Sequence, residues 1–366
     1  MIKIVRPTFL VDETICRANI RRMADRAARQ KLQLRPHFKT HQSATIGEWF
    51  RQAGVQSITV SSVQMAAYFA SHGWEDITIA FPVNVLEIEE INRLAQQIKL
   101  NLLVENTSAL SLLKKEITSE AGLYIEIDTG YFRSGVEINR VNQADELLAL
   151  LKGSPQLQFR GFLSHTGQTY SARSADEISV RHADALMKLR SLKAYYRAEW
   201  PDLEISLGDT PACSVCDQFD GVDEIRPGNF VFYDLMQQQL GVCSPEDIAV
   251  SVACPVVSRH LSRNEVVIYG GAVHLSKEFI LRPEGKRTFG RVAVRTNGRL
   301  ELLSEETYVS ALSQEHGIIR AAFADINRLQ VGSVVEIIPV HSCLTADLAG
   351  CYYTTSGEKI KKMAKS

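Results

Sequence analysis

The chain lacks the features of a membrane or secreted protein. Its 366 residues contain no apolar run near the ~20 residues that a membrane-spanning helix needs. The opening residues, MIKIVRPTFLVDET, lack the long apolar core and small-residue cleavage site of a secretory signal. Charge of one sign is not in excess, since 41 Lys and Arg against 42 Asp and Glu leave a net charge of −1. We therefore expect neither nucleic acid nor a membrane as a partner.

A regular cysteine framework is also missing. The seven cysteines are odd in number and irregularly spaced, which is typical of reduced thiols and leads us to expect a cytoplasmic location. Cys213 and Cys216 have redox-motif spacing, but nothing thioredoxin-like surrounds them, so we assign them no function. What the chain does have is ordinary: 45% hydrophobic residues, enough for a buried core in about two domains.

Short strand-like runs alternate with longer amphipathic segments in residues 1–238. We expect helices at 13–30, 85–97, 143–151 and 175–199, and strands at 8–11, 33–38, 57–61, 76–80, 99–104, 122–128, 157–165, 203–207 and 222–226. Such alternation predicts a parallel sheet, and about eight repeats favour a (β/α)8 TIM-type barrel over an open sheet.

The pattern of predicted secondary structure changes after about residue 240. Long helical patterns mostly stop, and short β-rich runs separated by Gly, Asn and Arg turns occupy 249–258, 265–269, 291–295, 300–303 and 333–338. We predict a smaller, all-β domain over residues 239–366. The chain is therefore expected to be an α/β barrel followed by a β domain.

The segment RPHFKTH at 35–41 ends a predicted barrel strand, where barrels place their chemistry. Lys39 there should point into the barrel mouth, where burial would lower its pKa and leave a nucleophilic amine suited to a Schiff base with an aldehyde cofactor. The alternative is a surface lysine in a loop.

Arg133, in EIDTGYFRSG at 126–135, follows another strand end. Its guanidinium is suited to a bidentate grip on a substrate carboxylate, and a salt bridge to a neighbouring carboxylate is the equal alternative.

The loops after the seventh and eighth barrel strands, SLGDTP at 206–211 and RPGN at 226–229, are rich in small and hydroxyl residues. Loops at these places commonly bind phosphate through backbone N–H groups. His165 and Tyr170, after the sixth strand, are suited to flanking a planar ring, although a buried, hydrogen-bonded histidine is the default for His165.

His341 and Cys343 lie two residues apart in a stretch that we expect to be extended, so both should face one way. Imidazole and thiolate are ligands that zinc prefers, and two protein ligands leave positions open for substrate and water. Coincidence is the alternative for such a pair.

Together these motifs resemble fold-type III pyridoxal-phosphate (PLP) enzymes, specifically the group of D-serine dehydratase and D-threonine aldolase, whose N-terminal barrel is alanine racemase-like. The resemblance is carried by 35–41, 126–135, 224–234 and PVHSC at 339–343, in that order. It implies PLP on Lys39, Arg133 near the substrate, a divalent metal (Zn2+) on His341 and Cys343, a homodimer, and cofactor contacts from His165, Tyr170, Gly208, Thr210, Gly228, Asn229 and Tyr233. One departure is Asp209, an acid where a neutral residue is expected near phosphate.

The resemblance implies a lyase acting on D-β-hydroxy amino acids. The dehydratases of this group carry His-x-Cys and the bacterial aldolases tend to carry His-x-Asp, so Cys343 favours dehydration of D-serine to pyruvate and ammonia. The alternative is a D-threonine or D-3-hydroxy amino acid aldolase giving glycine and an aldehyde, with His316 or a metal-bound water as base. A racemase needs two opposed bases and no metal, a non-catalytic PLP carrier resembles a lone barrel, and a barrel enzyme of other chemistry remains as the remote alternative.

Overall fold

The computed structural model describes residues 2–364, which form two compact units. Ile20–Phe230 makes the barrel unit, while the residues up to Asn19 join those from Val231 onward in the β unit. The predicted barrel domain, residues 1–238, therefore begins too early and ends too late. β1 (Thr8–Val11) was expected in the barrel half, but it pairs with β11 and β20 of the β unit. The expectation is wrong because a short apolar run does not encode which sheet it joins.

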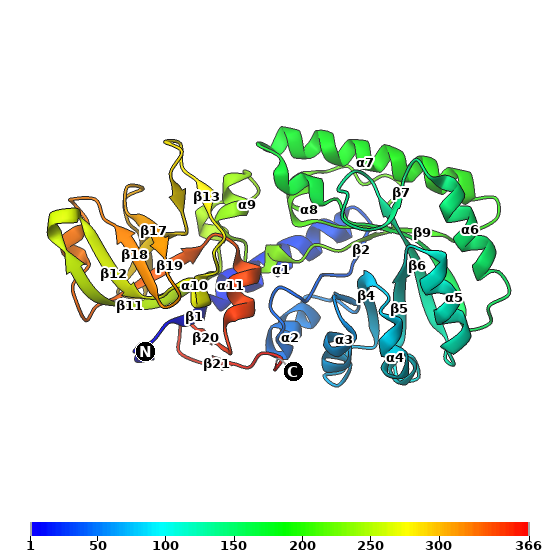
Figure 1. Ribbon diagram of the computed structural model, residues 1–366, viewed down its shortest axis with the longest axis horizontal. Coiled ribbons are helices and arrows are strands. Elements are labelled where there is room, and N and C mark those ends of the chain that lie inside the picture. Colours follow the sequence, from blue (N-terminus) through cyan, green and yellow to red (C-terminus); the bar gives the residue numbers. More distant parts are fainter. Residues whose placement is uncertain (1, 365–366) are drawn as a thin grey trace. The chain divides into compact units, whose positions relative to one another are not determined.

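The barrel unit contains the predicted parallel strands (Figure 1). Their order is β2-β10-β9-β8-β6-β5-β4-β3. The strands are β2 (Gln33–Leu34), β3 (Ile58–Val60), β4 (Asp76–Pro82), β5 (Lys99–Val104), β6 (Ala121–Asp128), β8 (Leu157–Ser164), β9 (Glu204–Leu207) and β10 (Glu224–Ile225), and β7 (Val136–Glu137) pairs with β6. A parallel bridge between His37 and Thr59 joins the two ends of this series, so the barrel is nearly closed and the predicted fold class is confirmed.

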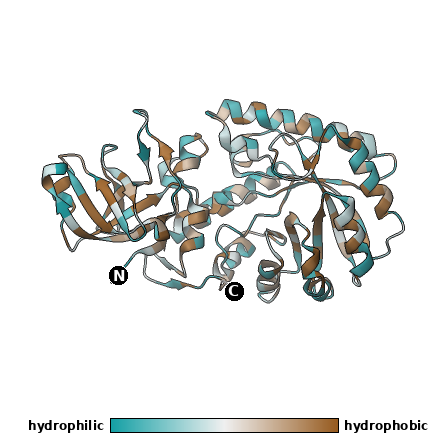
Figure 2. Ribbon diagram, in the orientation of Figure 1, coloured by the Kyte–Doolittle hydropathy of each residue, from teal (hydrophilic) through white to brown (hydrophobic). Residues whose placement is uncertain are grey.

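The helices of this part of the chain follow the predicted pattern. They are α1 (Glu13–Arg29), α2 (Ala44–Gln52), α3 (Val63–Ala70), α4 (Ile88–Ala95), α5 (Thr107–Glu116), α6 (Val141–Leu151), α7 (Ala175–Tyr196) and α8 (Thr210–Val215). Several begin at a side-chain cap, such as Asn106, which accepts a 2.8 Å hydrogen bond from the Ala109 N–H. Such caps satisfy backbone groups that a helix start leaves open. In Figure 2 the strands of both units are coloured largely as hydrophobic.

The interior of the barrel contains an ion network among its apolar strands. Arg35, 2% exposed, donates 2.5 Å hydrogen bonds to Glu224 and to Asp76. Burial opposes the charge of Arg35, but the two carboxylates raise the pKa of Arg35 above its ordinary value. Ser206 donates to the other Glu224 oxygen and accepts from Arg226, so the network reaches the strand ends where the candidate site lies.

The β unit is built around an antiparallel sheet whose pairing order returns to its start: β11-β12-β18-β17-β15-β19 and back to β11. These strands are β11 (Val250–His260), β12 (Glu265–Tyr269), β15 (Gly290–Thr296), β17 (Tyr308–Leu312), β18 (His316–Arg320) and β19 (Val334–Pro339). Further strands are β13 (Ile280–Leu281), β14 (Arg287–Thr288), β16 (Arg299–Leu302), β20 (Tyr352–Thr354) and β21 (Lys359–Ile360).

The β unit is mainly β, as predicted; its described residues also form the start of α1 and the short helices α9 (Leu235–Gln239), α10 (Ala272–Leu275) and α11 (Ser342–Leu348). Across residues 2–364, no helix is both long and apolar enough to cross a membrane.

Candidate active site

Lys39 lies in the turn that follows the His37 bridge at the carboxyl end of β2. The turn is anchored by Phe38, which is fully buried with its ring 4.9 Å from the rings of Phe50 and Phe69. Buried Thr40 and His41 follow, whereas Lys39 itself is exposed. The predicted burial of Lys39 is therefore wrong: its buried neighbours anchor the turn, and the lysine itself stays exposed.

Two histidines and three cations gather at this edge of the barrel. Burial, with the charges of Lys39 and Arg226, lowers the pKa of His37 well below its ordinary value. Burial, with the charges of Lys39 and Arg133, lowers the pKa of His165 to about 3. His165 Nδ1 lies 2.7 Å from the Gly208 carbonyl oxygen, so this half-buried histidine is hydrogen-bonded. Both imidazoles are neutral at pH 7, and the excess positive charge of the cluster favours an anionic ligand.

The loops after β9 and β10 meet, as their placement after adjacent strands predicted. The Gly228 N–H donates to the Thr210 hydroxyl over 3.3 Å, and the Thr210 N–H donates to the Tyr170 hydroxyl over 3.2 Å. A Cβ on Gly228 would lie 3.0 Å from His37 Cβ and from its carbonyl oxygen, so only glycine fits without a shift. Tyr170 is thus joined to the loop after β9.

Asp209, the departure noted in the sequence, has a structural role. It caps the start of α8 by accepting a 2.6 Å hydrogen bond from the Ala212 N–H, and it also accepts one from the Thr166 hydroxyl. Its side chain is 3% exposed, and burial raises the pKa of its carboxyl. The acid is thus used inside the loop as a helix cap.

Arg133 lies on the loop after β6, where the salt bridge and the substrate contact considered for it from the sequence are compatible. Its Nη2 is 4.0 Å from a Glu126 carboxylate oxygen, and its guanidinium lies 5.4 Å from the centre of the Tyr131 ring. The Arg133 side chain remains 50% exposed. A loose ion pair therefore coexists with a guanidinium that can still reach a substrate carboxylate.

The predicted metal pair lies in the β unit. His341 is extended and precedes α11, while Cys343 is in the first turn of that helix. The expectation that both residues are extended is therefore wrong, because the strand ends at Pro339. Burial acts in the opposite direction, but the hydrogen bond and charge of Cys343 raise the pKa of His341 to about 9. The two side chains are therefore in contact.

Asp234 anchors Ser342, the residue between His341 and Cys343. Its carboxylate accepts hydrogen bonds from the Ser342 N–H at 2.9 Å, the Ser342 hydroxyl at 3.1 Å and the Gln237 N–H at 3.0 Å. Within residues 2–364, no group of three His, Cys, Asp or Glu side chains is arranged to hold a metal. His341 and Cys343 would supply two protein ligands, with the remaining positions left to other molecules.

The other predicted site residues are distributed over both units. Asn229 is buried just after β10, and Tyr233 is buried in the β unit with a φ of 48°. His316 is exposed on β18, opposite Tyr269. The two redox-spaced thiols are both buried, which raises the pKa of Cys213 and of Cys216, so they are poor nucleophiles.

The residues of the barrel unit fit PLP. They present an amine on Lys39, a close-packed glycine loop at Gly228, and a cationic cluster with neutral imidazoles beside it. The nitrogen and sulfur side chains in contact at His341 and Cys343 likewise fit zinc.

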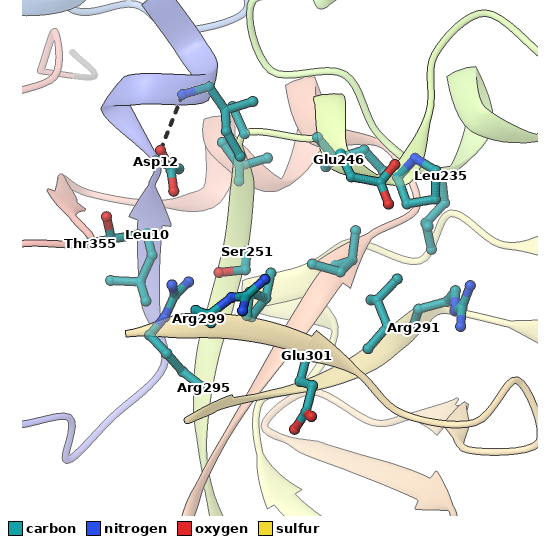
Figure 3. Close-up of a pocket in the computed structure, with 18 of the residues that line it drawn as sticks. Leu10, Asp12, Leu235, Glu246, Ser251, Arg291, Arg295, Arg299, Glu301 and Thr355 are labelled. Atoms are coloured by element: carbon teal, nitrogen blue, oxygen red, sulfur yellow. Dashed lines mark hydrogen bonds between the residues drawn. The ribbon is translucent and has the colours of Figure 1, made fainter. Parts of the chain in front are cut away.

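A separate cavity of about 530 Å³ in the β unit has a different character (Figure 3). Arg291, Arg295 and Arg299 line it, but Asp12, Glu246 and Glu301 line it as well. Arg295 donates 2.6 and 2.9 Å hydrogen bonds to Glu336. Among the described residues, its lining contains no Lys, His or Cys.

Three residues at the strand ends were not assigned from the sequence: His37, Glu126 and Arg226. Each lies within a motif already singled out, at the carboxyl end of its strand. The positional rule that identified Lys39 applies to them equally. Only the structure shows that they are buried there, at 9%, 3% and 5% exposure.

Comparison with known proteins agrees with this geometry. The chain is 29% identical to a D-serine dehydratase from Dictyostelium discoideum over 383 aligned positions, covering 96% of this chain and 93% of that protein. A solved structure of D-threo-3-hydroxyaspartate dehydratase from Delftia sp. HT23 superposes with a TM-score of 0.91 at 26% identity, covering 100% and 99% of the two chains. A D-threonine aldolase from Arthrobacter sp. is 24% identical over 62% of this chain and 61% of its own length.

Two family matches divide the chain much as its fold does. Residues 249–355 match the family described as "Putative serine dehydratase domain". Residues 11–235, more than half of the chain, match "Alanine racemase, N-terminal domain". The chain therefore belongs to the alanine racemase-like, fold-type III family of PLP enzymes, and within it the chain is similar to the group of D-serine dehydratase and D-threonine aldolase.

Proposed function

We propose that this chain is a PLP- and metal-dependent lyase that dehydrates D-β-hydroxy amino acids, D-serine first, to give pyruvate and ammonia. The observation that carries the choice of reaction is the contact between His341 and Cys343, a histidine–cysteine pair of the kind that zinc prefers as ligands. The aligned dehydratases cover more than nine-tenths of the chain, whereas the D-threonine aldolase covers 62%.

The residues of the chain have distinct tasks in this reaction. The Lys39 Nζ would hold the cofactor through its aldehyde and, as a free amine, would accept the Cα proton of the substrate. Arg133 binds and orients the substrate carboxylate. When bound, PLP delocalises the charge left at Cα, and zinc acts as a Lewis acid on the β-hydroxyl. D-serine loses water and then takes it up again as ammonia leaves, so the sum is one pyruvate and one ammonia.

His37 and His165 contribute as neutral groups. Because their pKa values are held below their ordinary values, neither imidazole takes up a proton in competition with Lys39 at neutral pH. Both imidazoles can line the site and form hydrogen bonds there. His165 is oriented by its hydrogen bond with the Gly208 carbonyl.

The test supplies D-serine, D-threonine and their L forms to the purified protein, with and without a chelator, and identifies the products. Pyruvate from D-serine that is lost in chelator supports the proposal. Glycine and acetaldehyde from D-threonine as the main products would replace it with the aldolase reaction, and unchanged turnover in chelator would remove the metal role.

Lys39→Ala tests the cofactor assignment. We expect loss of both the visible absorbance of the bound cofactor and the activity, because no other amine is assigned to the aldehyde. Lys115→Ala, on an exposed lysine of α5, is the matched control and should keep both. Absorbance retained in Lys39→Ala would contradict the assignment.

We also propose a cytoplasmic homodimer, as the resemblance implies. Light scattering on the purified holoenzyme measures the mass directly, and a mass near 40.8 kDa, that of one chain, would contradict the dimer.

A further inference from the structure

Glu126 is a buried acid that the proposed reaction leaves without a task. It lies near the carboxyl end of β6, and 3% of it is exposed. One carboxylate oxygen accepts a 3.0 Å hydrogen bond from the Ser134 hydroxyl. The other oxygen has no hydrogen-bond partner among the described residues. A buried carboxylate with an unsatisfied oxygen is costly, so its presence at a strand end calls for a reason.

The cation nearest to this acid is Arg133. The same Glu126 oxygen that accepts from Ser134 lies 4.0 Å from Arg133 Nη2. The Arg133 side chain is half exposed and has the Tyr131 ring on another side. A long, flexible cation on a loop would otherwise sample many orientations, which costs entropy each time it binds a ligand.

We propose that Glu126 is a positioning residue for Arg133: its carboxylate restrains the guanidinium at the barrel edge so that the outward N–H groups are preoriented for the substrate carboxylate. This inference rests on the proposed function through the role of Arg133. It adds a residue that acts through Arg133 without touching the substrate.

The loop that carries Arg133 is held by a second acid. Glu105, which follows β5, accepts a hydrogen bond from the Gly135 N–H. A Cβ on Gly135 would lie 3.1 Å from Glu126 Cγ, so the loop passes close over the Glu126 side chain. Glu105 therefore holds the loop backbone, while Glu126 is placed to restrain the guanidinium.

The groups around Glu126 shift the pKa at which its carboxyl ionises. Glu105 after β5, Arg133 and Ser134 on the loop after β6, and Arg226 after β10 face it. Burial is the main cause that raises the pKa of Glu126 above its ordinary value, and Glu105 adds to it. Above this raised pKa the carboxylate is ionised and attracts Arg133. As the pH falls through it, the attraction is lost.

The experiment compares Glu126→Gln with Glu120→Gln, a matched control just before the other end of β6 with an exposed side chain. Glutamine keeps the size of the side chain and can still accept from Ser134, but it lacks the charge. We expect Glu126→Gln to keep the cofactor absorbance and melting temperature and to weaken D-serine binding about tenfold. Glu120→Gln should match the parent protein.

Two further readouts separate positioning from a structural role. In the parent protein, D-serine binding should weaken on the acid side as Glu126 gains a proton, and Glu126→Gln should lose this dependence. Adding Glu126→Gln to Arg133→Ala should have no further effect. Unchanged binding in Glu126→Gln, a retained acid dependence, or additive effects in the double variant would each overturn the proposal.

D-serine binding is followed through the change in cofactor absorbance, so the test does not depend on which product forms. A parent protein that binds D-serine but gives no pyruvate would contradict the proposed function alone. If Glu126→Gln does not fold, Glu126→Asp, which keeps the charge but shortens the reach, takes its place with the same expected weakening.

Discussion

Phe38→Ala should destabilise the barrel unit more than any surface change, because Phe38 is the buried anchor of the Lys39 turn. Its ring is fully buried and lies 4.4 Å from the His41 ring, 4.9 Å from those of Phe50 and Phe69, and 5.1 Å from that of Trp74. Removing a buried phenylalanine costs about 3–5 kcal/mol, and aromatic pairs add about 0.5–1.5 kcal/mol each.

We therefore expect a loss at the upper end of this range, about 4–5 kcal/mol of unfolding free energy, because the site loses several ring contacts together. Urea unfolding followed by tryptophan fluorescence measures it, since Trp74 contacts the ring. Phe81→Ala, on a side chain that is 58% exposed, is the control and should cost little. A loss below about 1 kcal/mol would refute the packing argument, since it would match a surface substitution.

Four further changes test other parts of the molecule. Arg35→Met should cost about 3–5 kcal/mol in urea unfolding, because it leaves Glu224 buried without its cation; a neutral result would contradict the ion network. Asp209→Asn keeps the size of the α8 cap residue but removes a buried charge. Because burial raises the Asp209 pKa, the wild type should lose stability relative to the variant as the pH rises through that pKa, which melting temperatures at pH 5 and pH 8 would reveal or refute. The His165 pKa of about 3 lies below its unfolded value, so the stability it contributes should be lost as the pH falls from about 6.5 toward 3, and His165→Gln should flatten that acid limb. Cys343→Ala should release the bound metal on dialysis, measured by atomic absorption, and full retention would remove Cys343 as a ligand.

Much of the barrel could be predicted because its information is local. The periodicity of each helix and strand is written in neighbouring residues, and the rule that barrel chemistry lies at carboxyl strand ends places Lys39, Arg133 and Gly228 without coordinates. The motifs in their order also identified the family, which the matches over residues 11–235 and 249–355 confirm.

Errors arose where local pattern and tertiary context differ. β1 has the same β-branched, apolar character as a barrel strand, yet it pairs with β11. His341 and Cys343 were read as one extended segment, but a helix begins between them. Lys39 was expected to be buried, yet the residues around it occupy the interior. Strand partners and burial depend on contacts between residues far apart in sequence, which no single segment encodes.

The sequence by itself determined the fold class, the order of the functional motifs and the residue types available for PLP and zinc. Tertiary structure decided which charged groups share a site. Glu126 is an acid in a strand like many others until β6 places it, buried, 4.0 Å from Arg133. The physical reason is that a side chain's chemistry depends on its burial and neighbours, and both are set only when distant strands come together.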